Sequence, residues 1–157
     1  MKWIRPYLAV GPIIGDRYWA TTWSALRKNK VTAIIDLNDS EPERLEAEFL
    51  GFKYHGLPIN DPPFDSQELL DAFPVVCNWI DEERSGGGKV YLHCTGGVER
   101  SPTCAAAYLI FDEGLSTNQA IGQVAGKNKK DWVRRTYVGV FFDGLEEWNN
   151  VARKFQT

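Results

Sequence analysis

The sequence contains few of the residues from which metal centres and disulfide frameworks are built. It has two histidines and three cysteines in 157 residues, and Cys77, Cys94 and Cys104 show neither disulfide nor metal-pair spacing. Two histidines argue against a zinc site, and unpaired thiols are typical of a reducing compartment. We therefore expect a cytoplasmic protein.

Long apolar runs and an excess of positive charge are also missing. The longest apolar stretches, near residues 7–15 and 103–111, are far too short to span a bilayer, and no signal peptide follows Met1. The net charge is −3, which leaves no basic excess to neutralise nucleic-acid phosphates. We expect neither a membrane nor a nucleic acid as partner, and a single domain over residues 1–157.

What the chain does contain is an alternation of strand and helix patterns. The segment 31–37 is β-branched and almost continuously apolar, which is typical of a strand buried on both faces. The segment 65–84 carries apolar residues at helical spacing, although Pro74 interrupts it. Such alternation predicts an α/β domain with a mostly parallel sheet of four to five strands and helices on both faces. The expected strands are 7–11, 31–37, 52–59 and 89–93, and the expected helices are 22–29, 41–50, 65–84, 101–113, 116–128 and 137–154.

The stretch HCTGGVERSP, residues 93–102, lies between an expected strand and an expected helix. Loop N–H groups and a helix N-terminus at such a junction form a cradle for an anion. Gly96 and Gly97 allow the loop to curl round a small tetrahedral group, and Pro102 suits the first helical turn. In a parallel sheet, ligands bind at the carboxyl ends of the strands, where this stretch lies.

Three side chains in this stretch suit phosphate chemistry. The dipoles that hold an anion also favour the thiolate of Cys94, which makes it a nucleophile. The planar guanidinium of Arg100 can bind two phosphoryl oxygens at once. Ser101 can donate a hydrogen bond to the sulfur when it must leave a phosphocysteine. A structural cysteine beside a glycine turn would need neither Arg100 nor Ser101.

The full string, His-Cys-x-x-Gly-x-x-Arg-Ser, resembles the signature of the cysteine-dependent protein tyrosine phosphatases, and Pro102 and the short chain resemble their dual-specificity branch. The resemblance implies phosphate binding by the loop, no metal or organic cofactor, and a supporting role for His93 in orienting the loop. Two positions depart from the usual pattern: Gly96 replaces an alanine, and Glu99 adds negative charge at the rim. The implied phosphate-binding residues are Thr95, Gly96, Gly97, Val98, Glu99 and Arg100.

A general acid must protonate the leaving oxygen, and the family places an aspartate about thirty residues before the cysteine. Asp61 lies 33 positions before Cys94 and follows an expected strand, so we expect it to act as acid and then as base. Asp65 is the rival, but its capping-box spacing to Glu68 gives it a structural role. Asp36 also ends a strand, where a turn or capping role explains it.

The resemblance implies a phosphatase that acts on phosphotyrosine, phosphoserine or phosphothreonine in proteins. Two alternatives stay open. A pseudophosphatase would bind phosphorylated partners without turnover, an alternative that Glu99 favours. A phosphatase of a non-protein substrate would act on a phosphoglucan or an RNA 5′-phosphate. The expected partner is thus a phosphorylated protein or another phosphomonoester, and we expect a monomer.

Overall fold

The computed structural model describes residues 1–15, 21–60, 65–95, 99–125 and 138–155. These residues form a five-stranded sheet in the order β1-β2-β5-β3-β4, with β1 antiparallel to β2 and the other neighbours parallel. The strands are β1 Lys2–Arg5, β2 Leu8–Gly11, β3 Ala33–Asp36, β4 Lys53–Gly56 and β5 Val90–His93. The helices are α1 Trp23–Lys28, α2 Glu41–Phe49, α3 Ser66–Ser85, α4 Arg100–Glu113, α5 Thr117–Ala125 and α7 Val138–Phe155.

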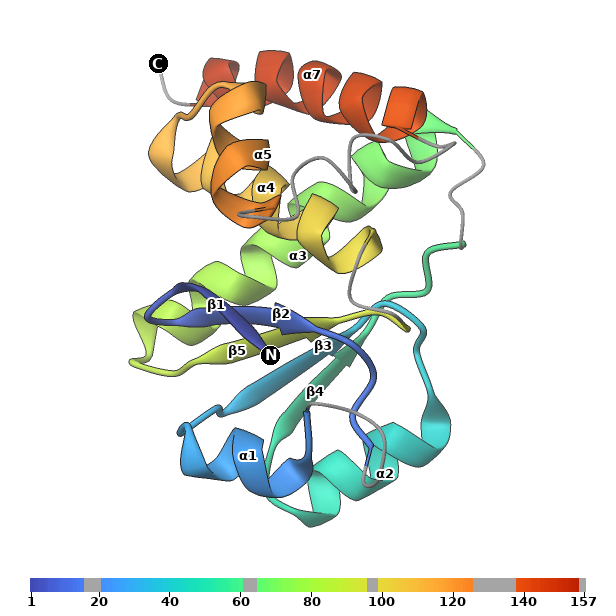
Figure 1. Ribbon diagram of the computed structural model, residues 1–157, viewed down its shortest axis with the longest axis vertical. Helices are drawn as coiled ribbons and strands as arrows, with labels where there is room; N and C mark the ends of the chain where they lie inside the picture. Colours follow the sequence, from blue (N-terminus) through green and yellow to red (C-terminus); the bar gives the residue numbers. More distant parts are fainter. Residues whose placement is uncertain (16–20, 61–64, 96–98, 126–137, 156–157) are drawn as a thin grey trace.

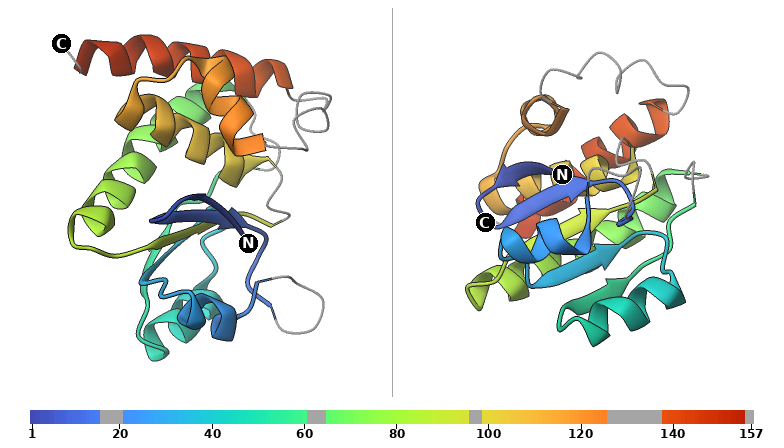
Figure 2. Two further views of the ribbon diagram at one scale, coloured as in Figure 1. Left: turned by 60° about the vertical axis from the view of Figure 1, so that its left-hand side comes forward. Right: turned by 60° about the horizontal axis from the view of Figure 1, so that its bottom comes forward.

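The predicted fold class is confirmed, with one strand that the sequence did not predict. Helices α1 and α2 cover one face of the sheet, and α3, α4, α5 and α7 cover the other (Figures 1 and 2). The missed strand, β1, is short and half-exposed, and only Ile4 in it is buried. Its pattern therefore carries too little apolar periodicity to be recognised, and only pairing with β2 makes it a strand.

Alternate residues of the central strands feed two separate cores. Ile35 and Leu92 belong to the large core beneath α3, α4, α5 and α7, whereas Ile34 and Tyr91 belong to the smaller core beneath α1 and α2. This follows from the two-residue period of a strand. It also fixes which way the residues at the carboxyl ends of β3 and β5 point.

Helix α4 runs through the middle of the large core. Residues 100–110 are buried without exception, and Gly114 ends the helix in the left-handed region, with φ of 68°. Helices α3, α5 and α7 all pack against it (Figure 1). The first turn of α4, where Arg100 and Ser101 lie, is therefore held in place from several sides.

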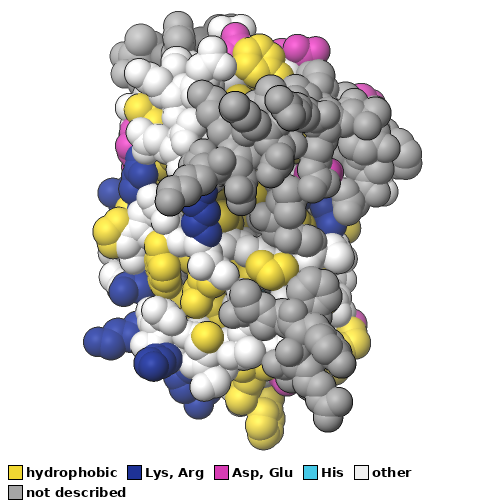
Figure 3. Space-filling model, viewed as in Figure 1, with side chains coloured by type: hydrophobic (Ala, Val, Ile, Leu, Met, Phe, Trp, Pro, Cys, Tyr) yellow, Lys and Arg dark blue, Asp and Glu magenta, His cyan; other side chains and the backbone are white. Residues whose placement is uncertain are grey.

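Two observations concern membrane insertion and the distribution of positive charge. Within the described ranges, no helix has the length and apolarity needed to cross a bilayer. On the face seen in Figure 3, lysines and arginines gather mainly along the left-hand edge, on the side of α1. The carboxyl ends of the parallel strands lie toward the opposite edge (Figure 1).

Candidate active site

The carboxyl end of β5 and the first turn of α4 bring Cys94 and Ser101 together. Cys94 follows the last residue of β5 and is only 2% exposed. Its Sγ lies 3.4 Å from Ser101 Oγ, within hydrogen-bond range for sulfur. The hydroxyl can therefore donate a hydrogen bond to the sulfur.

The alternation of side chains along β5 explains why Cys94 and His93 lie on opposite faces of the sheet. Cys94 belongs to the large core on the α4 side. His93 points to the other face, where it stacks on Tyr91, with ring centroids 5.5 Å apart, and meets Glu43 of α2. Cys94 thus faces α4, and His93 faces a buried cluster of charged side chains on the α2 side.

The guanidinium of Arg100 lies across the carboxyl ends of the strands. Its Nη1 donates to Asn38 Oδ1 and to the Ile59 carbonyl, each at 2.9 Å, and its Nη2 donates to Thr95 Oγ1 at 3.2 Å. Thr95 Oγ1 in turn donates to Asn38 Oδ1 at 3.2 Å. The two ends of the loop after Cys94 are therefore joined through Arg100 and Thr95, with Asn38 as their common acceptor.

An open hollow of about 530 Å³ lies beside this guanidinium. Its lining is largely polar and comes from the ends of β3 and β4 and from the loop after β5. The lining residues are Leu37, Asn38, Pro58, Ile59, Asn60, Thr95 and Arg100. A cationic, concave surface next to a buried thiol suits a phosphoryl group.

Comparison with known proteins decides the family. The family model described as the dual specificity phosphatase catalytic domain matches residues 14–149. The chain belongs to the dual specificity phosphatase family. It is 36% identical over 111 residues to the dual specificity protein phosphatase Mpk3 of Drosophila melanogaster, across 71% of this chain and 26% of that protein. It is 35% identical over 113 residues to dual specificity protein phosphatase 22 of Xenopus tropicalis, across 72% of this chain and 51% of that one.

Solved structures support the same dual specificity phosphatase fold. The structure of DUSP15 superposes with a TM-score of 0.75 at 23% identity, covering 99% of this chain and 94% of that one. The human tyrosine phosphatase-like serine/threonine/tyrosine-interacting protein gives 0.71 at 25% identity, covering 96% of each chain. The chain spans about a quarter to a half of the curated relatives cited above.

Four of the predicted site residues lie outside the described residues: Asp61, Gly96, Gly97 and Val98. Their immediate neighbours are described. Asn60, directly before Asp61, lines the hollow beside Arg100. Glu99 precedes α4 as its N-cap residue, and its carbonyl accepts hydrogen bonds from the N–H and the hydroxyl of Thr103.

The two rival aspartates both have structural partners. Asp65 caps α3, since its Oδ1 accepts from the backbone N–H of Glu68 at 3.1 Å. Asp36 ends β3 and holds the following turn, because its carboxylate accepts from the N–H groups of Asn38 at 2.8 Å and Ser40 at 2.9 Å. These capping and turn roles agree with the sequence interpretation.

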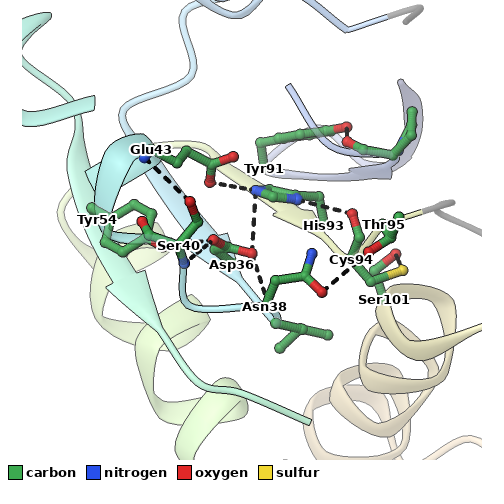
Figure 4. Close-up of polar contacts among 12 residues, drawn as sticks. Asp36, Asn38, Ser40, Glu43, Tyr54, Tyr91, His93, Cys94, Thr95 and Ser101 are labelled. Carbon is green, nitrogen blue, oxygen red and sulfur yellow. Dashed lines mark hydrogen bonds and ion pairs between the residues drawn. The ribbon is translucent and has the colours of Figure 1, made fainter. Parts of the chain in front are cut away.

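The sequence did not reveal the charged cluster behind Cys94 (Figure 4). His93 is fully buried; its Nε2 lies 2.7 Å from Glu43 Oε2 and 3.7 Å from Asp36 Oδ1, and its Nδ1 lies 3.1 Å from the Cys94 carbonyl. The Tyr54 hydroxyl also donates to Asp36, at 2.6 Å. Asp36 and His93 are register partners in β3 and β5, which is why they share a face.

The cluster shifts the protonation of its members. Burial disfavours a charged His93, but the hydrogen bond and charge of Glu43, with Asp36, outweigh it and raise the pKa of the imidazole. Burial would raise the pKa of Asp36, but charged His93 and the Tyr54 hydrogen bond outweigh it and lower that pKa. Burial raises the pKa of Glu43 despite its bond to His93.

Asp36, Glu43 and His93 are also close enough to one another to hold a metal ion, with ligand atoms within 4.8 Å. The hydrogen bonds already made argue for a different use. Asp36 accepts three hydrogen bonds from protein donors, and Glu43 faces the ring nitrogen directly. The set is therefore built as a hydrogen-bonded network that supports His93.

The other two cysteines are buried in the large core. Burial raises the pKa of Cys77, on α3, and that of Cys104, on α4, far above the usual range for a thiol. Both remain neutral thiols that act as small apolar side chains. The thiol with a hydroxyl partner at a helix N-terminus is Cys94.

Proposed function

We propose that this chain is a metal-independent phosphatase that hydrolyses phosphate monoesters on proteins through a phosphocysteine at Cys94. The observation that carries the proposal is the 3.4 Å approach of Cys94 Sγ to Ser101 Oγ at the junction of β5 and α4. Membership of the dual specificity phosphatase family supports it. The guanidinium of Arg100, beside an open hollow, supplies the charge that a phosphoryl group needs.

In the first step the thiolate of Cys94 attacks phosphorus and forms the S–P bond. The bond from phosphorus to the ester oxygen breaks, and that oxygen takes a proton from Asp61 as it leaves as an alcohol or phenol. Arg100 and the N–H groups of residues 95–100 hold the three equatorial oxygens, whose charge is spread in the transition state. Asn38 accepts a hydrogen bond from Nη1 of Arg100, which positions the guanidinium near the loop before substrate binds.

In the second step water attacks the phosphocysteine. The Asp61 carboxylate, left by the first step, takes a proton from the water, and the S–P bond breaks to release inorganic phosphate. Sulfur departs as a thiolate, and the Ser101 hydroxyl donates to it. The cycle ends with Cys94 ionised and Asp61 protonated, as it began.

The proposed partners are phosphorylated proteins, and the proposed setting is a reducing, cytoplasmic one. All three cysteines are free, and a catalytic thiolate requires that they stay so. The relatives Mpk3 and dual specificity protein phosphatase 22 are named as protein phosphatases of dual specificity. We propose the same substrate class here, and a monomer.

The test is hydrolysis of para-nitrophenyl phosphate in chelator and reductant by wild type, Cys94→Ser and Cys77→Ser. We expect turnover in wild type and Cys77→Ser and none in Cys94→Ser, because Cys94 is the cysteine that meets a hydroxyl at the start of α4 within the described residues. Absence of turnover in wild type would overturn the proposal. If wild type is active, its rates on phosphopeptides carrying phosphotyrosine, phosphoserine or phosphothreonine, on a phosphoglucan and on an RNA 5′-phosphate would rank the substrates.

The binding alternative makes the opposite prediction in the same assay. A pseudophosphatase would show no turnover and would bind a phosphopeptide equally well before and after Cys94→Ser. One solved relative of the same fold is named a phosphatase-like interacting protein. Tight phosphopeptide binding without turnover would therefore place this chain with such proteins.

A further inference from the structure

We infer that Glu43 is a positioning residue for the phosphatase reaction: it keeps both ring nitrogens of His93 protonated, so that a buried imidazolium holds the Cys94 carbonyl at the start of the phosphate loop. The inference rests on the proposed function for its effect on turnover. Its structural half, the charge state of His93, is independent of turnover.

The hydrogen bonds fix the proton on Nδ1 and leave two places for the proton between His93 and Glu43. A carbonyl can only accept, so the 3.1 Å contact requires that His93 Nδ1 carries a hydrogen and donates it to the Cys94 oxygen. The 2.7 Å contact between His93 Nε2 and Glu43 Oε2 also contains a proton. That proton lies either on the ring, which makes an imidazolium–carboxylate pair, or on Glu43.

Asp36 places this proton on the ring. Its carboxylate accepts from two backbone N–H groups and from the Tyr54 hydroxyl, which keeps it ionised. The ionised carboxylate lies 3.7 Å from His93 Nε2 and favours a charged ring. The Asp36 carboxylate also disfavours an ionised Glu43. The attraction of a charged His93 to both carboxylates nevertheless favours the ion pair over a neutral His93 beside a protonated Glu43.

Titratable groups lie around His93 on α2, β3, β4 and β5. Glu43 comes from α2, Asp36 from β3 with Tyr54 of β4 behind it, and Tyr91 from β5 stacks on the ring. Burial raises the pKa of Tyr91 above the usual tyrosine range, so Tyr91 stays neutral. The partner of His93 on β2 in the sheet register is Gly11, which has no side-chain charge. Glu43 and Asp36 therefore set the charge of the ring.

The orientation of the pair gives it a role in the reaction. His93 lies between Glu43 and the Cys94 backbone, so the positive end of the pair is the end toward the loop (Figure 4). A thiolate and a bound phosphate are both anionic, and both are stabilised by a fixed positive end nearby. Ser40 caps α2 and Glu43 lies in its first turn, which fixes the carboxylate at this point.

The substitution Glu43→Gln separates charge from shape. Glutamine has the same length and can donate its amide N–H to a neutral Nε2, so that the Nδ1–H bond to Cys94 survives with an uncharged ring. Glu46→Gln is the matched control, since Glu46 is exposed on the same helix. The sequence has only two histidines, and the other, His55, is an internal reference for the NMR spectrum.

The experiment follows ring nitrogen and ring proton NMR signals of His93 and His55 against pH in wild type, Glu43→Gln and Glu46→Gln. We expect a doubly protonated His93 at neutral pH in wild type and Glu46→Gln, and a midpoint lowered by about one pH unit or more in Glu43→Gln. A ring that is neutral at pH 7 in wild type overturns the inference, even if Glu43→Gln does not fold. So does an unchanged midpoint in Glu43→Gln.

Turnover supplies the second readout. We expect kcat/KM of Glu43→Gln to be roughly tenfold below wild type at pH 7.5, and the gap to close as the pH falls through the new midpoint of His93 and the ring regains its charge. A deficit that is the same at every pH would indicate a merely structural role and would contradict the inference. If wild type lacks turnover, the proposed function fails while the NMR result still decides the state of His93.

Discussion

The two faces of the sheet treat the polar atoms at its carboxyl edge in opposite ways. On the α4 side, a buried thiol meets one neutral hydroxyl, that of Ser101. On the α2 side, one residue earlier, a buried imidazole meets two carboxylates. The difference teaches that the reactive sulfur and the buried carboxylates are kept on separate faces. A carboxylate against the sulfur would oppose a thiolate, whereas a carboxylate behind His93 supports one.

The largest expected effect comes from removing the sulfur on the α4 side. Cys94→Ser should lower kcat on para-nitrophenyl phosphate by at least about 10⁴-fold, because a hydroxyl at this site is not ionised and cannot replace the thiolate. The fold should persist, since serine is close in size. Circular dichroism would check the fold, and residual turnover above a hundredth of wild type would contradict the role of Cys94.

The next effect separates the two aspartates before α3. Asp61→Ala should lower kcat by roughly 10²- to 10⁴-fold on a substrate with a poor leaving group, because no acid then protonates the leaving oxygen. Asp65→Ala should leave kcat unchanged and lower the free energy of unfolding by about 1 kcal/mol, since it removes the α3 cap. Urea denaturation and steady-state kinetics on both variants would distinguish them, and the reverse pattern would make Asp65 the acid.

A smaller effect tests the hydroxyl that meets the sulfur. Ser101→Ala should slow the second step more than the first, by roughly 10- to 100-fold, because the departing thiolate loses a hydrogen bond to a charged group. The phosphocysteine should then accumulate. A pre-steady-state burst of para-nitrophenol that wild type lacks would show this, and an equal slowing of both steps would contradict it.

The smallest effect concerns the α2 side and is seen in stability rather than turnover. The pKa of His93 is raised, so its contribution to stability is complete below about 6.5, the unfolded value, and is lost as the pH rises through the folded one. The pKa of Asp36 is lowered, so its contribution is present above about 3.9 and is lost as the pH falls through the folded value. The melting temperature should therefore fall toward alkaline pH.

The variant Glu43→Gln tests whether His93 causes the loss of stability at alkaline pH. Burial lowers the pKa of His55, so His55 acts on stability at lower pH than His93. Glu43→Gln should flatten the decline of melting temperature above neutral pH, because its His93 is already neutral there. Parallel curves for wild type and Glu43→Gln between about pH 6.5 and pH 9 would contradict the assignment.

The sequence predicted the α4 side of this comparison and missed the α2 side. Cys94, Arg100 and Ser101 lie in one contiguous string, and a strand before it and a helix after it suffice to predict a cradle. Glu43 lies 50 positions from His93 and comes near it only through strand register and the start of α2. Such a contact leaves no periodic or spacing signal in a single sequence.

The element boundaries show the same limit. The expected strand 31–37 is shortened to Ala33–Asp36. At its start the N–H of Val31 bonds back to the Leu26 carbonyl of α1, and after its end the Asp36 carboxylate holds the turn. The expected strand 52–59 is shortened to Lys53–Gly56 at the edge of the sheet. Apolar patterns report burial, and burial extends beyond the residues that pair in a ladder. The role of Asp61 stays a prediction.

The alternation along β5 has a consequence for how this signature can be inherited. A gain or loss of one residue within β5 would leave the ten-letter motif unchanged, yet it would turn the sulfur toward the carboxylates of α2 and the imidazole toward α4. Where no β-bulge absorbed the change, we expect such a relative to match by sequence and to lack turnover. The length of the strand before the motif, counted to the residue, is therefore as diagnostic of an active enzyme as the motif itself.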